Sequence, residues 1–257
     1  MNDSKSDKHA RVGKLDVHYE LAGPAGAPVV TFVHGLVASL EHWAPAAEAL
    51  VAEGFRVLRY DLRAHGSTTA LREPCSRHDL AADLVGLMEV LGIARSAVVG
   101  HSAGGVIAQQ TALDFPGRVS ALALVGTSSA CNDKAAAWYS QCIEVARDRG
   151  GGALMQLMGS NPERAAVPDG AGIVPVIEAM RSLNTDPLTE RLRELHVPTL
   201  IIVGDEDFLG VGGSVILSRA IAGSELEIVP ERGHGIYYEA PDWFARRLGV
   251  FLAKHLL

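Results

Sequence analysis

Six short runs dominated by apolar residues recur along the chain, and this recurrence constrains the fold more than any other feature. The runs lie at residues 29–33, 55–60, 96–99, 121–125, 199–203 and 226–229. Most are continuous rather than alternating, which is typical of strands that are covered on both faces. The stretch 14–21 alternates more, as an antiparallel or edge strand does. The chain is therefore expected to build its core around one sheet.

Helical patterns lie between and after these runs. Residues 44–53, 76–91 and 240–256 place apolar side chains three or four residues apart, and the first two segments are followed by a glycine suited to a helix end. Such alternation of strands and helices predicts an α/β fold, with a mostly parallel sheet and helices on both of its faces. A chain of 257 residues fits a single unit of this kind.

The alternation stops between residues 130 and 195. This segment has no good strand pattern, but it has helical patterns, several prolines and three glycines at 150–152. An insertion of helices between two strands predicts a helical cap or lid at 130–195, and the alternative is a set of surface helices that gate nothing. The α/β core then comprises residues 10–129 and 196–257, and residues 1–9 form a flexible polar tail.

The segment Gly-His-Ser-Ala-Gly at residues 100–104 is the leading candidate for a catalytic site. Gly-x-Ser-x-Gly alone is a weak signal in a chain with 27 glycines. Its context strengthens it, because a strand pattern ends at Val99 and a helical pattern continues from Val106. Ser102 is therefore predicted to be a nucleophile at a sharp strand-to-helix turn. The alternative is a serine that only caps the helix.

A serine nucleophile needs a general base and an acid that orients this base. In sheets with this kind of turn, the acid and then the histidine follow the serine along the chain. His234 stands between two glycines after the run at 226–229 and is the predicted base. Three carboxylates follow the run at 199–203. The reach to His234 favours Asp207 as the acid, with Asp205 in reserve.

An acyl-transfer site also needs N–H groups that stabilise an oxyanion. The N–H of Ala103, directly after the nucleophile, is one candidate. The N–H of Leu36, in the His-Gly-Leu segment that follows the run at 29–33, is the other. His34 is expected to be a hydrogen-bonded structural residue, and His101 is expected to be a bystander.

Composition argues against several other classes of function. A net charge of −7 without a cluster of lysine or arginine disfavours nucleic acid as a partner. Three irregularly spaced cysteines suggest neither a disulfide framework nor a zinc site. The chain shows no signal-peptide pattern and no run of about 20 apolar residues, so we expect a cytoplasmic protein without a membrane partner. We also predict no metal and no cofactor.

In this order, the segments resemble the enzymes of the α/β-hydrolase fold family over nearly the whole chain, from about Val17 to Leu252. The resemblance rests on the residues at 34–35, 60–67, 100–105, 204–207 and 233–234. It implies an α/β-hydrolase fold, with a mostly parallel sheet of about eight strands, helices on both faces and a helical cap above the carboxyl edge.

Within this family, residues 59–66 and 79–92 look like those of β-ketoadipate enol-lactone hydrolases and small esterases. The chain departs from their pattern at Ala64, where glycine is usual, and at Thr68, where serine is usual. It also lacks the proline that usually follows the acid, so the loop after Asp207 is expected to have a different shape.

The resemblance implies a serine hydrolase that cleaves a carboxylic ester or lactone of a small molecule through an acyl-enzyme on Ser102. Apolar and aromatic residues of the cap and the acid loop are candidates for substrate binding: Trp138, Tyr139, Met158 and Phe208. The same triad could serve C–C bond hydrolysis, hydroxynitrile lysis or perhydrolysis, and a non-catalytic ligand receptor is a further alternative. The sequence leaves the substrate and the oligomeric state open.

Overall fold

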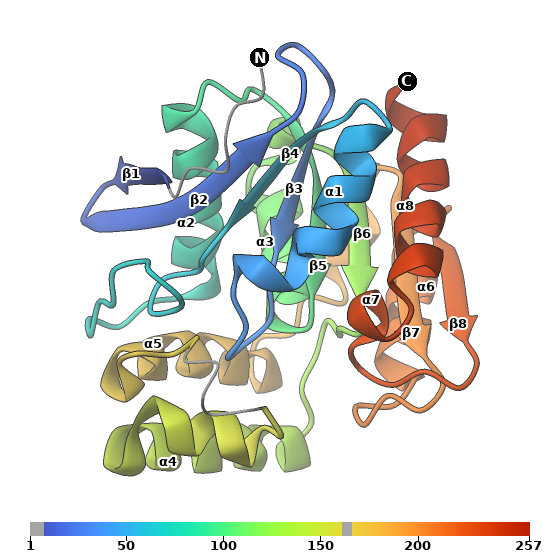
Figure 1. Cartoon of the computed structure of the whole chain (residues 1–257). Coiled ribbons are helices and arrows are strands. Elements are labelled where there is room, and N and C mark those ends of the chain that lie inside the picture. The colour runs from blue at the N-terminus through green and yellow to red at the C-terminus, as the bar shows by residue number, and fades with distance from the viewer. Residues whose placement is uncertain (1–7, 161–165) are drawn as a thin grey trace.

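The centre of the computed structural model, which describes residues 8–160 and 166–257, is an eight-stranded sheet (Figure 1). The spatial order of its strands is β1-β2-β4-β3-β5-β6-β7-β8. β1 and β2 pair antiparallel with each other, β2 pairs antiparallel with β4, and all other neighbours are parallel. The bounds are β1 Lys8–Val12, β2 Leu15–Ala22, β3 Val29–Val33, β4 Arg56–Tyr60, β5 Ser96–His101, β6 Val119–Val125, β7 Thr199–Gly204 and β8 Glu225–Val229. The predicted α/β architecture is confirmed.

The strand β1 is the one strand that the apolar runs do not predict. A flexible tail is predicted through residue 9, but Lys8 and His9 already pair with Tyr19 and His18 of β2. This edge strand buries little apolar surface, which explains why its sequence reads as a polar tail. The predicted tail is therefore too long by two residues at its end, and residues 1–7 lie outside the described part of the chain.

Helices cover both faces of the sheet, as predicted. On one face lie α1 Ala44–Ala52 and α8 Pro241–Leu256, and on the other lie α2 Arg77–Val90, α3 Ala103–Asp114 and α6 Gly212–Ala220 (Figure 1). Each face has its own apolar core, because side chains of a buried strand alternate between the two faces. Among the residues that the structure describes, every helix is too short or too polar to cross a membrane.

The chain leaves the sheet between β6 and β7 and forms helices there. Its described part contains α4 Asp133–Leu157, α5 Gly170–Arg181 and two short 3-10 helices, without a strand. In Figure 1, α4 and α5 lie together below the carboxyl ends of the strands. Residues 161–165 of the predicted cap lie outside the described part.

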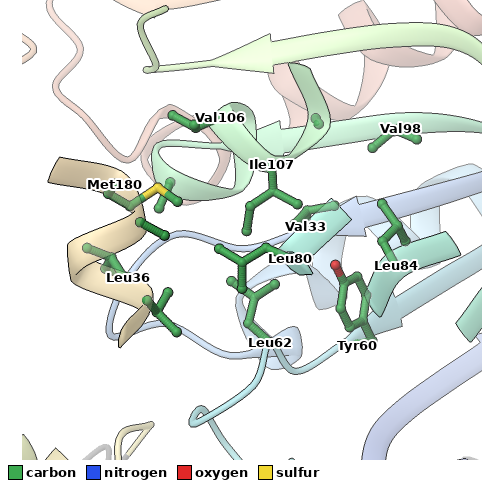
Figure 2. Close-up of a cluster of buried hydrophobic side chains, with 14 of the residues drawn as sticks. Val33, Leu36, Tyr60, Leu62, Leu80, Leu84, Val98, Val106, Ile107 and Met180 are labelled. Carbon is green, nitrogen blue, oxygen red and sulfur yellow. The ribbon is translucent and has the colours of Figure 1, made fainter. Parts of the chain in front are cut away.

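The helix α5 packs directly on the carboxyl edge of the sheet. Figure 2 shows Met180 of α5 beside Leu36 and Val106, and all three belong to one apolar core cluster. Met180 is fully buried. The helix α5 is therefore fixed over the loop that contains Leu36 and over the first turn of α3, and α4 packs against α5.

Candidate active site

Ser102 lies between β5 and α3 in a conformation that few non-glycine residues adopt, with φ 53° and ψ −119°. Its N–H donates to the carbonyl of Val125 at 2.9 Å, and its carbonyl accepts a hydrogen bond from Thr127 Oγ1 at 2.8 Å. Its hydroxyl makes no capping bond to α3, which contradicts the helix-cap alternative. A strained residue held by its neighbours is typical of functional sites.

Two glycines make this turn possible. A Cβ atom on Gly100 would lie 2.3 Å from the carbonyl oxygen of Gly104. A Cβ atom on Gly104 would lie 2.2 Å from the carbonyl oxygen of Val33. Real Cβ atoms essentially never approach so closely, so α3 can begin against β3 only because both positions lack a side chain.

His234 and Asp207 form a hydrogen-bonded pair at the same edge of the sheet. The Nδ1 atom of His234 lies 2.9 Å from Oδ2 of Asp207. The Asp207 side chain is 1% exposed, and its second oxygen accepts the N–H of Leu209 at 2.8 Å. Because a carboxylate only accepts hydrogen bonds, Nδ1 carries the proton and Nε2 carries a lone pair. The imidazole is thus held in the tautomer that a general base needs.

The structure brings Asp207, and not Asp205, to His234. Asp205 and Glu206 are exposed, whereas Asp207 is buried. The N–H of Asp205 donates to the carbonyl of Val229 in β8, which fixes the start of the loop at the end of that strand.

Gly126 lies between the His234–Asp207 pair and the backbone that holds Ser102. A Cβ atom on Gly126 would lie 3.1 Å from both Asp207 Oδ2 and His234 Nδ1. Gly126 directly follows Val125, whose carbonyl accepts the N–H of Ser102. Serine, histidine and aspartate therefore converge on the end of β6.

Two side chains that the sequence does not single out for catalysis hold the loop of His234. The carboxylate of Glu239, in the short helix α7 Ile236–Glu239, accepts the N–H of Gly233 at 2.7 Å and that of Gly235 at 3.0 Å. The Nε2 atom of His101 donates to the carbonyl of His234 at 3.0 Å. His101 is therefore more than the predicted bystander. Burial and the neighbouring His234 keep its pKa well below the ordinary value, so the ring is neutral.

The main-chain N–H groups of Leu36 and Ala103 are the predicted donors to an oxyanion. Within residues 8–160 and 166–257, neither has a hydrogen-bond acceptor. Ala103 is the first residue of α3, where N–H groups lack partners in the helix and where the helix dipole is positive. A Cβ atom on Gly35 would lie 3.1 Å from Cβ of Ser102, so the loop of residues 34–37, here called the Leu36 segment, lies beside Ser102.

Two neutral histidines shape the Leu36 segment. His34 Nε2 accepts the N–H of Leu62 at 3.0 Å, and His65 Nε2 accepts the N–H of Val37 at 3.2 Å. Their Nδ1 atoms therefore carry the protons and donate to main-chain carbonyls at 2.8 and 3.0 Å. Burial and, second, the neighbouring His65 lower the pKa of His34 to about 3, and burial also lowers the pKa of His65. His34 is thus the structural residue that the sequence predicts.

The four candidate substrate residues occupy two different places. Trp138 and Tyr139 of α4, with ring centroids 5.2 Å apart, and Met158 are half-buried against the core cluster that includes Leu36. Phe208 is 70% exposed, and its ring centroid lies 4.6 Å from that of His234. Of these four, only Phe208 has a ring contact with the His234–Asp207 pair.

The three cysteines are free thiols. Burial raises the pKa of Cys75 and of Cys142 to about 11 each, and it raises that of Cys131 as well. Nucleophilic cysteines have the opposite shift, because the reactive form is the thiolate. The nucleophile at this site is therefore expected to be the serine.

Known proteins are similar to this chain over most of its length. Residues 28–150 match the family model described as alpha/beta hydrolase fold. RutD of Caulobacter vibrioides, provisionally named a carbamate hydrolase, is 30% identical, and the match covers 94% of this chain and 97% of the relative.

Two solved structures give the same result. The enol-lactonase of Burkholderia xenovorans LB400 superposes with a TM-score of 0.86 at 28% identity, over 96% of this chain and 100% of the lactonase. A thermophilic esterase of Thermogutta terrifontis superposes with a TM-score of 0.84 at 25% identity, over 98% of both chains. The chain therefore belongs to the α/β-hydrolase fold family and is a hydrolase.

Proposed function

We propose that this protein is a serine hydrolase that cleaves carboxylic esters or lactones of small molecules through an acyl-enzyme on Ser102. One observation carries the proposal: the hydrogen-bonded pair of His234 and the buried Asp207 stands at the sheet edge where the backbone holds Ser102 at φ 53°. A strained serine beside an oriented imidazole is the arrangement required for nucleophilic attack on a carbonyl.

In the first step, Ser102 Oγ forms a bond to the carbonyl carbon of the substrate while Nε2 of His234 takes the hydroxyl proton. Asp207 stabilises the resulting imidazolium. The N–H groups of Leu36 and Ala103 stabilise the negative charge on the tetrahedral oxygen. The tetrahedral intermediate then collapses, the bond to the leaving alkoxide breaks, and His234 returns the proton to this oxygen.

In the second step, water attacks the acyl group on Ser102, again with His234 as the base. The carboxylic acid leaves and the serine is regenerated. A lactone follows the same route, except that its alcohol remains attached to the acyl group until water releases the opened product.

We further propose that residues 130–195 act as the helical cap that the sequence predicts. The buried contact between α5 and the Leu36 segment supports this role, because it covers the oxyanion side of the site. Trp138, Tyr139 and Met158 then contribute to the wall of the acyl site through the same apolar cluster.

Carbamate hydrolysis is a second candidate. It is favoured by the likeness to the RutD relative over almost its full length. The chemistry is compatible with the same groups, because a carbamate is also a carbonyl with a leaving group that His234 can protonate.

An assay with p-nitrophenyl esters, simple lactones and carbamates tests the proposal. The wild-type protein should exceed Ser102→Ala by at least about a thousandfold in kcat on the preferred class. A fluorophosphonate probe should label the wild-type protein and not the variant. Equal turnover by both proteins on every substrate would refute the proposal and favour a ligand receptor.

A further inference from the structure

Apolar side chains are exposed next to the catalytic pair. Among the described residues, eight large apolar side chains are exposed, and three of them lie on the two segments that present Asp207 and His234. These three are Phe208 at 70%, Leu209 at 51% and Tyr238 at 61% exposure. Water is a poor solvent for such surfaces, so exposed apolar side chains on the segments beside a reaction centre indicate a binding site.

Phe208 is tied to the site by two contacts. Its ring meets that of His234 in an edge-to-face arrangement, with an interplanar angle of 62°. The N–H of the next residue, Leu209, bonds to the Asp207 carboxylate at 2.8 Å, which fixes the backbone on which Phe208 stands. Tyr238 lies on the other segment, and its ring occupies the space that a Cβ atom on Gly235 would fill.

The chemistry of the proposed reaction determines on which side of the site each part of the substrate lies. The carbonyl oxygen of the substrate points to Leu36 and Ala103, beneath α5. The leaving oxygen must face His234, because this residue delivers its proton. The alcohol part of the ester therefore extends on the His234 side, where Phe208 is exposed.

We propose that Phe208, together with Leu209, binds the alcohol part of the substrate, and that this part is apolar or aromatic and uncharged. This inference rests on the proposed function and specifies its substrate class. Charge supports it, because the same two segments carry one cation, the partly exposed Arg232, but three exposed carboxylates, Asp205, Glu206 and Glu231. These carboxylates would repel an anionic alcohol.

Acetate esters with different alcohols test this assignment, since they share one acyl-enzyme. The ratio of kcat/KM for benzyl acetate to that for methyl acetate should fall about fivefold in Phe208→Ala, which is the size of an aromatic contact. Phe208→Tyr, which keeps the ring, should retain the ratio. Val250→Ala is the matched control, because Val250 is 63% exposed on α8 and has no role in the site.

A second series varies the acyl group of methyl esters from acetate to hexanoate. Phe208→Ala should leave the hexanoate-to-acetate ratio unchanged. A change in this ratio, or an unchanged benzyl-to-methyl ratio, would overturn the assignment. Equal use of benzyl acetate and 4-carboxybenzyl acetate by the wild-type protein would overturn the claim of an uncharged alcohol.

These outcomes are distinct from failure of the proposed function. If the wild-type protein is no faster than Ser102→Ala on every ester, lactone and carbamate, the hydrolase mechanism itself is wrong. If the wild-type protein is active but the benzyl-to-methyl ratio is the same in the wild-type protein and in Phe208→Ala, only the assignment of the alcohol site is wrong.

Discussion

The side chain of His101 donates a hydrogen bond from Nε2 to the main-chain carbonyl of His234 at 3.0 Å. The residue next to Ser102, the proposed nucleophile, therefore holds the backbone of His234, the proposed base. The two rings also pack together, with centroids 4.6 Å apart. The rings of Trp43 and Tyr237 also contact the ring of His101 edge to face, and the His101 side chain is buried.

His101→Phe should lower kcat about ten- to a hundredfold and leave KM nearly unchanged, because a small misplacement of a catalytic group has this effect on rate. His101→Gln keeps an N–H donor and should recover a large part of the loss. Steady-state kinetics on one ester measure both parameters. Equal kcat in the two variants would show that packing, and not the hydrogen bond, is what matters.

Asp207→Asn should lower kcat about 10⁴-fold, because an amide can donate to Nδ1 and stabilise the wrong tautomer of His234. Asp205→Asn is the matched control, since Asp205 is exposed and lies two residues away. It should change kcat less than about threefold. A large loss in Asp205→Asn with little loss in Asp207→Asn would transfer the role of the acid to Asp205.

The sequence is sufficient to predict the parts of the site that depend on local pattern. The end of each continuous apolar run shows where a strand ends, and the carboxyl ends of parallel strands lie along one edge of the sheet. For this reason the sequence alone predicts that Ser102, Asp207 and His234 lie near one another. Seven of the eight strands begin and end within two residues of the predicted runs.

The residues that hold these groups are less accessible to prediction. His65 and His101 bind main-chain atoms of distant segments, and Glu239 binds N–H groups four and six residues before it; none of these bonds leaves a periodic pattern in the sequence. His65 and Val37, for example, are 28 residues apart. The exposure of Phe208 likewise depends on how the acid loop folds, and its sequence alone gives no indication of this.

Gly104→Ala should destabilise the protein by about 3 kcal/mol or more, because the new Cβ atom would lie 2.2 Å from a backbone oxygen of β3 and backbone cannot easily move away. Gly117→Ala is the matched control, because nothing lies within 4 Å of the position of its Cβ atom. The control should change stability by less than about 1 kcal/mol. Urea unfolding measures both, and equal stability of the two variants would contradict the close approach of α3 to β3.

Lowering the pH from 7 to 5 should destabilise the protein through its buried neutral histidines. The pKa of His34 is about 3 in the folded state against the ordinary 6.5. Between these values the unfolded chain binds a proton that the folded protein excludes, so stability rises with pH through this window and falls as the pH is lowered.

His34 alone should cost about 2 kcal/mol of stability at pH 5 compared with neutral pH, and His65 and His101 add to this loss because burial lowers their pKa values too. Urea unfolding at pH 7 and pH 5 measures the change. Nitrogen NMR of the histidine rings supplies an independent check, since His34 should remain neutral at pH 5 in the folded protein. If the His34 ring instead titrates near its ordinary pKa, its Nε2 atom does not accept the N–H of Leu62 in a buried site. The loop that carries Leu36 would then be held by other contacts.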